Sequence, residues 1–139
     1  MIDPLDEFLG YRLRRASGLM MADLAQTLEP TGLRATEASV LLAIAANPDS
    51  GQSDIGRLLG IQRANMTPII AALLARELVD RSASDGRSHS LRLNAAGEVL
   101  AADVKARIIT HEARFTRDLD PAERVVLLEQ LRKVGGRRL

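Results

Sequence analysis

Positions 62–67 gather side chains that can make two hydrogen bonds to one planar partner. The run is Gln62-Arg63-Ala64-Asn65-Met66-Thr67. An Arg matches the major-groove edge of guanine with two bonds, and an Asn matches that of adenine in the same way. The chemistry of this run is therefore the reading of bases, with Arg63 on guanine and Asn65 on adenine. The expected base contacts are Gln62, Arg63, Asn65 and Thr67. The alternative to base contact is that these residues form an exposed polar helix face. For Gln62, a further alternative is that it only caps the helix.

A second polar run, Asp85-Gly86-Arg87-Ser88, has the composition of a tight turn. A single Arg on a thin loop suits the minor groove of DNA or the phosphates beside it. We expect Arg87, between Gly86 and Ser88, to make that contact. Asp85 is expected to orient an Arg of this region through a charge-assisted hydrogen bond. The alternatives are an idle loop cation for Arg87 and a plain turn residue for Asp85.

Positive charge is concentrated in the middle of the chain. The net charge of the whole chain is only +1, which says nothing about nucleic acid. Between positions 55 and 93, however, six arginines face three carboxylates, and Arg is the cation best suited to phosphate and guanine. We predict phosphate contacts for Arg57, Arg81 and Arg92. The alternative is that these arginines pair with acidic residues of the same chain, Glu77 or Asp80.

Hydrophobic spacing and turn residues predict the elements that position these side chains. The first helix is expected to begin at Asp3-Pro4 and to run for about 25 residues until Pro30 and Gly32. A second helix, capped by Thr36, ends at the turn cluster 47–51. A short third helix ends at Gly60, and the fourth carries the 62–67 run. The chain then shows a hairpin within 78–93, a long helix capped by Asn94, and a last helix that restarts at Asp120-Pro121.

The order helix, Gly turn, helix and basic hairpin is that of a winged helix-turn-helix, in which the second helix of the pair enters the major groove. The predicted fold class is therefore α+β and mostly helical, in one domain of residues 1–139. Residues 36–93 form the DNA-binding region of this fold. Helices as long as the first and fifth exceed what a small core needs, so we assign residues 1–33 and 95–136 to dimerisation.

Several stretches in register resemble the MarR family of multiple antibiotic resistance regulators. They are residues 53–61, residues 66–81, Asp85-Gly86-Arg87, and Leu91-Arg92-Leu93-Asn94-Ala95-Ala96-Gly97. The resemblance extends over residues 5–134. It implies a homodimer that binds a pseudo-palindromic site in duplex DNA. The lack of a signal-peptide start and of a membrane-length apolar run makes a cytoplasmic protein the expectation. The resemblance further implies a transcriptional regulator, and we expect a repressor that a small aromatic or anionic effector releases. Pro68, Ala71 and Ala72 depart from the charged residues often found there, and Glu77 stands where Gly is common.

Three residues of the long helices are candidates for an effector pocket. Tyr11 and Arg15 lie one helical turn apart and could meet an anionic ligand. His111 falls on the apolar stripe of the fifth helix, between Ile108 and Phe115. For His111 the favoured interpretation is a histidine satisfied within a core or an interface, and a pocket or pH-sensing role is the alternative. For Tyr11 the favoured interpretation is interface packing.

Other classes of protein find no support in the sequence. The chain has no Cys, which excludes disulfides, thiolate metal sites and cysteine nucleophiles. It shows no motif of an enzyme, a metal site or a phosphate-binding loop, and no apolar run approaches the length of a membrane span. The acidic N-terminus lacks the start of a signal peptide. We expect no cofactor. The alternative function is a winged-helix protein-interaction module without specific DNA binding.

Overall fold

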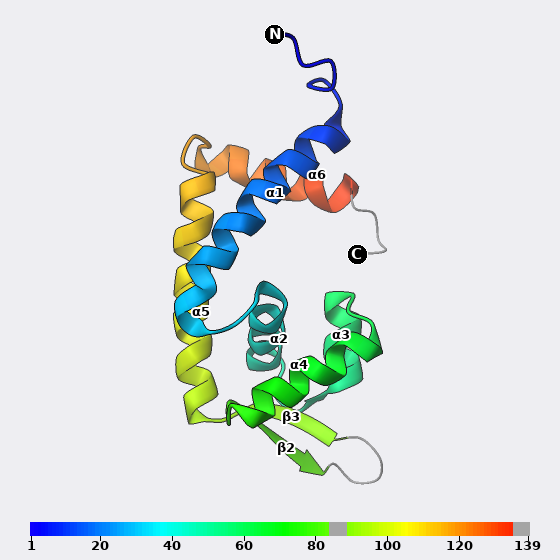
Figure 1. The fold of residues 1–139 in the computed structure, drawn as a ribbon, viewed down its shortest axis with the longest axis vertical. Helices are drawn as coiled ribbons and strands as arrows, with labels where there is room; N and C mark the ends of the chain where they lie inside the picture. Colours follow the sequence, from blue (N-terminus) through cyan, green and yellow to red (C-terminus); the bar gives the residue numbers. More distant parts are fainter. Residues whose placement is uncertain (84–88, 135–139) are drawn as a thin grey trace.

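The computed structural model describes residues 1–83 and 89–134. The elements in chain order are α1 (Leu9–Leu28), the 3₁₀ turn η1 (Glu29–Thr31), α2 (Ala35–Ala46), β1 (Ser50–Gly51), α3 (Gln52–Leu59), α4 (Arg63–Ala75), β2 (Val79–Ala83), β3 (His89–Leu93), α5 (Ala95–Phe115) and α6 (Pro121–Val134). Figure 1 shows two levels joined by α5. The lower level holds α2, α3, α4 and the sheet, and the upper level holds α6 and most of α1. The α+β, mostly helical architecture predicted from the sequence is confirmed.

The two helices of the helix-turn-helix meet at a glycine turn. Gly60 ends α3 in the left-handed conformation, with φ of 66°, and the N–H of Ile61 donates to the carbonyl of Gly56 at 2.8 Å. The axes of α3 and α4 enclose a bend of 118°. A Cβ on Gly56 would lie 3.1 Å from Cγ of Met66, so the small residue lets the two helices approach closely. The predicted end of α3 at Gly60 is confirmed.

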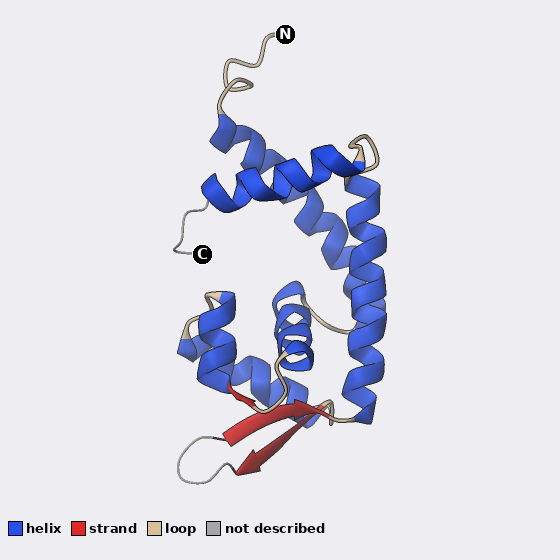
Figure 2. Ribbon diagram, turned by 180° about the vertical axis from the view of Figure 1, so that it is seen from behind, coloured by secondary structure: helices blue, strands red, loops and turns tan. Residues whose placement is uncertain are grey.

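The strands form a small antiparallel sheet beside the helices of the lower level (Figure 2). β2 pairs with β3 in the predicted hairpin, with Arg81 opposite Leu91. A third strand, β1, pairs with the other edge of β3, which gives the order β1-β3-β2. The sequence predicted only a turn at positions 47–51. The strand has two residues, too short for an alternating pattern, and its pairing is secured by a bond from the N–H of Asp49 to the carbonyl of Leu91 at 2.9 Å.

The junction between the sheet and α5 is held by Asn94 and Gly97. The side chain of Asn94 accepts from the N–H of Gly97 at 3.0 Å, which is the predicted N-cap. Its amide donates to the carbonyl of Glu77 at 2.7 Å. Glu77 has a φ of 53°, which explains why Gly is common at this position in the family that the sequence resembles. Gly97 lies against the carbonyl of Leu78, so that the helix and the sheet touch at backbone level.

The core is aliphatic and belongs to the lower level. Its largest fully buried members are Leu28, Leu41, Ile44, Ile55, Met66, Ile70, Leu73, Leu91, Val40 and Val104, joined by His111. By contrast, α1 buries only Leu28 and α6 buries no residue. The upper level therefore presents apolar side chains that the chain itself does not cover.

Two helix starts differ from the sequence prediction. α1 begins at Leu9 rather than at Asp3-Pro4, because Asp3 caps an isolated turn, accepting from the N–H of Leu5 at 3.0 Å and the hydroxyl of Tyr11 at 2.6 Å. α2 begins at Ala35, and its cap is not Thr36. Instead the carboxylate of Glu37 accepts from the N–H of Arg34 at 2.8 Å.

Among the described residues, no single helix has the length and apolar composition needed to cross a membrane. α3 and α4 taken together reach that length and composition, but they are bent by 118°. Their apolar residues Ile55, Met66 and Ile70 are buried in the core.

We predict that Gly97→Ala lowers the free energy of unfolding by about 1–3 kcal/mol, the usual cost of overpacking. The added Cβ would lie 2.0 Å from the carbonyl oxygen of Leu78, so the backbone must move. The matched control is Gly10→Ala in α1, where a Cβ meets no atom within 4 Å and Ala favours the helix. Urea unfolding of the two variants measures the difference, and equal stability of both would contradict the prediction.

Candidate nucleic-acid interface

The start of α4 presents a polar face on a firmly anchored helix. The carbonyl of Gln62, at the N-cap, accepts from the N–H groups of Asn65 at 2.9 Å and Met66 at 3.1 Å. Met66 is 1% exposed and fixes the helix to the core. The remaining residues of the run are exposed: Gln62, Arg63, Ala64, Asn65 and Thr67. A helix whose leading polar residues face outward while its apolar stripe is buried is shaped for a groove of DNA.

A side-chain contact joins α3 to this polar face. The amide of Gln52, the first residue of α3, donates to the hydroxyl of Thr67 at 3.3 Å. The same hydroxyl donates to the carbonyl of Arg63, also at 3.3 Å. Sequence reasoning did not single out Gln52, since its partner lies 15 residues away. The helix also continues through Pro68, which removes one backbone donor without ending α4.

The three arginines predicted to contact phosphates have different surroundings. Arg57 pairs with Asp54 at 3.2 Å within α3, and Arg92 pairs with Asp49 through both of its carboxylate oxygens. Neither partner is the predicted Glu77 or Asp80. The Arg92 guanidinium holds the pKa of Asp49 below its usual range. The paired side chains are still well exposed, 78% for Arg57 and 61% for Arg92, so both remain candidates for phosphate contact.

Arg81 lines a hollow between the helix-turn-helix and the sheet. We call it the wing hollow; it measures about 390 Å³. Its lining residues are Gly51, Gln52, Ser53, Asp54, Arg63, Thr67, Arg81, His89 and Leu91. Three residues of the predicted contact surface, Arg63 and Thr67 on α4 and Arg81 on β2, thus line one hollow. The predicted loop residues Asp85, Arg87 and Ser88 lie outside the described residues.

The three candidates for an effector pocket do not share one site. Tyr11 and Arg15 are together: Nη1 of Arg15 donates to the Tyr11 hydroxyl at 3.1 Å. The guanidinium groups of Arg14 and Arg15 lie 5.5 and 5.6 Å from the centre of the Tyr11 ring, within reach of cation–π attraction. This cluster sits near the N-terminal end of α1. His111 lies elsewhere, where α1 packs on α5.

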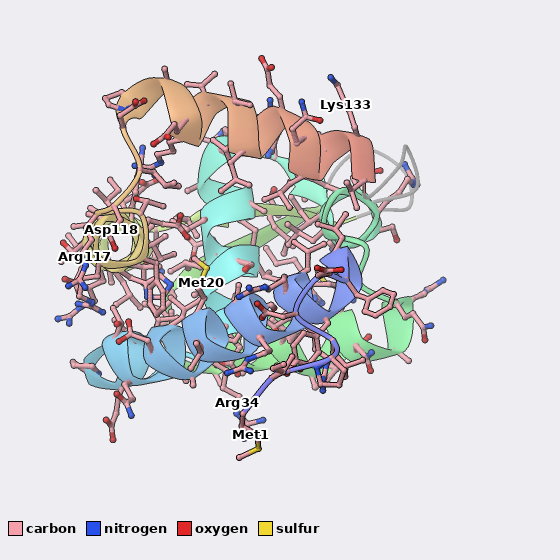
Figure 3. The ribbon with its side chains drawn as sticks, turned by 90° about the horizontal axis from the view of Figure 1, so that it is seen from above. Met1, Met20, Arg34, Arg117, Asp118 and Lys133 are labelled. Carbon is pink, nitrogen blue, oxygen red and sulfur yellow. The ribbon has the colours of Figure 1, made fainter. Side chains whose placement is uncertain are left out.

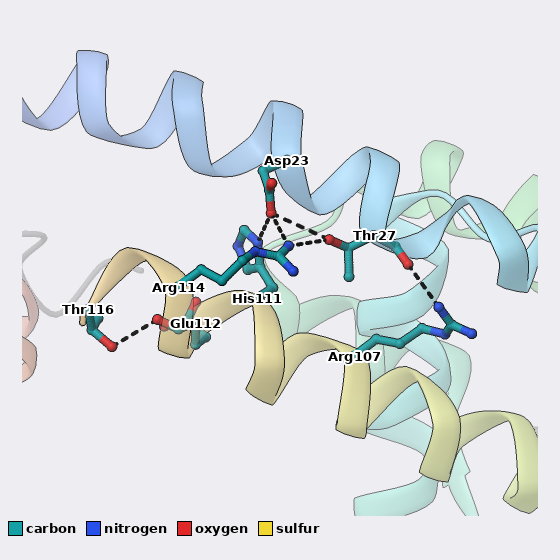
Figure 4. Close-up of polar contacts among 7 residues, drawn as sticks. All are labelled: Asp23, Thr27, Arg107, His111, Glu112, Arg114 and Thr116. Carbon is teal, nitrogen blue, oxygen red and sulfur yellow. Dashed lines mark hydrogen bonds and ion pairs between the residues drawn. The ribbon is translucent and has the colours of Figure 1, made fainter.

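His111 is part of a polar cluster that joins α5 to α1 (Figure 4). It is only 2% exposed, and its Nδ1 lies 2.7 Å from Oδ2 of Asp23. Arg114 bonds the same carboxylate and donates to the hydroxyl of Thr27 at 2.9 Å. These bonds, from Arg114 first and then His111, lower the pKa of Asp23. The favoured interpretation of His111 as a satisfied buried histidine is confirmed, while sequence reasoning missed Asp23 and Arg114, which are 91 residues apart.

The described residues contain no group of three or more His, Asp or Glu side chains that could hold a metal ion.

The fold matches known proteins closely. A family model described as "MarR family" matches residues 31–88. A solved structure of the transcriptional repressor CouR bound to a 23-mer DNA duplex is 36% identical, with 98% of each chain covered and a TM-score of 0.90. The chain belongs to the MarR family. CouR bound to p-coumaroyl-CoA is 34% identical over 99% of this chain and 98% of the other, with a TM-score of 0.85.

MarR membership also agrees with a curated relative. An HTH-type transcriptional repressor of Mycobacterium bovis is 27% identical over 138 residues, which cover 94% of this chain and 96% of the relative. The MarR family and these relatives are transcription regulators, not enzymes.

The Asp23 cluster generates a prediction about acid stability. Because the pKa of Asp23 is lowered in the folded chain, its bonds stabilise the fold above the ordinary value of 3.8. That contribution is lost as the pH falls from 3.8 through the lower folded value. We expect Asp23→Asn to lower the thermal midpoint near neutral pH and to lose less of it on acidification than the unmodified chain.

The matched control is Asp118→Asn, whose carboxylate is 89% exposed at the far end of α5 (Figure 3). Thermal unfolding followed by circular dichroism at several pH values provides the comparison. Parallel curves for Asp23→Asn and the unmodified chain would rule out the role given to Asp23.

Proposed function

We propose that this chain is a ligand-responsive transcriptional repressor that binds a pseudo-palindromic site in duplex DNA as a homodimer. The observation that carries the proposal is the start of α4, where exposed polar side chains stand on a helix anchored by Met66. The base-reading residues are Gln62, Arg63, Asn65 and Thr67. Arg57, Arg81 and Arg92 contact phosphates beside the groove, and Asp85, Arg87 and Ser88 form the wing contact.

The upper level supports a dimer. Large apolar side chains of α1 and α6 are exposed in the single chain, among them Leu19, Val125, Leu127, Leu128 and Leu131. A cleft of about 350 Å³ opens between α1, α5 and α6, with Met20 and Leu128 among its lining residues. Figure 3 shows Met20 on the side of α1 that faces α6. An apolar cleft beside an apolar helix is suited to the same elements of a second copy.

The proposed division of the chain follows from these surfaces. Residues 36–93 bind DNA, and residues 1–33 and 95–136 assemble the dimer. Two-fold symmetry then separates the half-sites by about one helical turn, roughly 10 base pairs. Because duplex DNA is the proposed partner, we place the protein in the cytoplasm.

The effector that we propose is aromatic and anionic. The support is the solved CouR with p-coumaroyl-CoA, a ligand that has both properties. In this chain the Tyr11, Arg14 and Arg15 cluster offers an aromatic ring with two cations. His111, which the Asp23 carboxylate holds in place, is the less suitable candidate for direct ligand contact because it is buried.

We predict that Asn65→Ala relaxes discrimination at one operator position by about 1–3 kcal/mol, because one paired contact to a base is lost. The companion variant Arg87→Ala is expected to weaken binding to all sequences and to flatten the salt dependence. An operator selected from a random duplex pool, followed by mobility-shift titrations of single-base variants, separates the two effects. No salt-sensitive shift at micromolar protein would favour the alternative, a protein-interaction module.

We predict that Leu128→Asp converts the dimer into a monomer, since it replaces an apolar side chain of the cleft by a charged one that the second copy would have to desolvate. The matched control, Lys133→Asp, places the same side chain on α6 outside the residues that line the cleft. The mass in solution at micromolar concentration checks both variants. A monomeric mass for the unmodified chain would overturn the dimer itself.

A further inference from the structure

The wing hollow contains a residue that the proposed function has not used. His89, the first residue of β3, is exposed and lines the hollow beside Arg63, Arg81 and Asp54. The other histidine of the chain, His111, is committed to Asp23 in the interior. His89 is thus the one of the two histidines that a ligand on this face can reach.

The charges around His89 come from three elements. Arg81 on β2 and Arg63 on α4 are cations, and Asp54 on α3 is the carboxylate among the described lining residues. Asp54 is partly neutralised by Arg57 at 3.2 Å. The formal charge of the lining is therefore +1 with a neutral imidazole and +2 with a protonated one. One proton doubles the positive charge of the hollow.

The position of the hollow determines which part of a bound DNA duplex lies over it. It lies between α4 and the two strands of the wing. In duplex DNA the sugar-phosphate chain of one strand separates the major groove from the minor groove. If α4 occupies the major groove and β2 and β3 approach the adjoining minor groove, that DNA strand crosses the wing hollow. The first turns of α3 and α4, where N–H groups favour anions, form its other wall.

We propose that the wing hollow binds a backbone phosphate of DNA, and that protonation of His89 adds an ion pair to this phosphate. The inference rests on the proposed function. Arg81 supplies the permanent charge, and a protonated His89 adds a second one. A phosphate that pairs with the protonated imidazole favours proton uptake on binding, so the affinity for DNA rises as the pH falls. The residue lies at the edge of the surface that reads sequence, so the effect applies to every duplex.

The test uses the full chain and a random-sequence duplex of about 30 base pairs, so that no operator is needed. Fluorescence anisotropy at constant ionic strength gives the affinity at about pH 6 and about pH 8. We expect binding about five- to tenfold tighter at the lower pH in 0.1 M salt, and a logarithmic salt slope steeper by about 0.9, as one added phosphate contact requires. His89→Gln should remove both differences.

Two controls separate this effect from other causes. Arg117→Gln, at the exposed end of α5, removes one cation far from the hollow and should keep the full pH dependence. Inorganic phosphate in place of chloride at equal ionic strength should compete with the duplex more strongly at the lower pH, and less so with His89→Gln. A pH dependence that survives His89→Gln, or none in the unmodified chain, overturns the inference while the proposed function stands. No binding at any pH overturns the proposed function.

Discussion

The contact between the start of α5 and Leu78, just before β2, fixes the orientation of the lower level, which holds α2, α3, α4 and the sheet. Gly97 lies against the carbonyl of Leu78, and Asn94 bonds both the first turn of α5 and the carbonyl of Glu77. No side chain separates the two backbones, so the angle between the sheet and the long helix has little freedom. Since β3 runs directly into this junction, the wing is positioned by α5 as much as by its own pairing.

A second connection ties the upper level to the same helix. The carboxylate of Asp23 on α1 is shared by His111 and Arg114 of α5, and Arg107 of α5 contacts the carbonyl of Thr27 at 3.5 Å (Figure 4). These interactions are polar, whereas the rest of the core is aliphatic. Hydrogen bonds and ion pairs require a defined geometry between the two helices. α5 is thus held at one end by backbone contact and at the other by charge-assisted bonds. A ligand that changes the packing of α1 on α5 would therefore change the placement of the wing.

Much of this architecture can be predicted from the sequence, because the signals are local. Gly60, Asn94 and the Asp120 to Glu123 pair mark helix ends through bonds to their own neighbours, with the Asp120 carboxylate accepting from the N–H of Glu123 at 2.8 Å. The exposed polar run at the start of α4 could be predicted as well, since its residue types and the spacing of the buried stripe are local signals. What was missed depends on distant partners. β1 exists only because β3 lies beside it, and the early start predicted for α1 failed because Asp3 bonds Tyr11 instead.

The candidate site shows the same difference between features set by local sequence and features set by distant partners. The sequence singled out Arg92 for its charge, but its partner Asp49 sits 43 positions earlier in a left-handed turn, with φ of 66°. Tyr11 and His111 were grouped because both lie on long helices, and only the three-dimensional structure shows that they belong to different clusters. Residue type predicts what a side chain can bind, whereas its actual partner depends on the fold.

The bare apolar surface of α6 has a consequence for the amount of protein in the cell. No residue of α6 is fully buried within its own chain, so a partner that covers this helix would stabilise it, by mass action, more at higher concentration. A subunit without that partner would leave apolar helices open to proteases and chaperones. For the proposed dimer, such turnover would leave a pool enriched in paired subunits that can bind both halves of a DNA site.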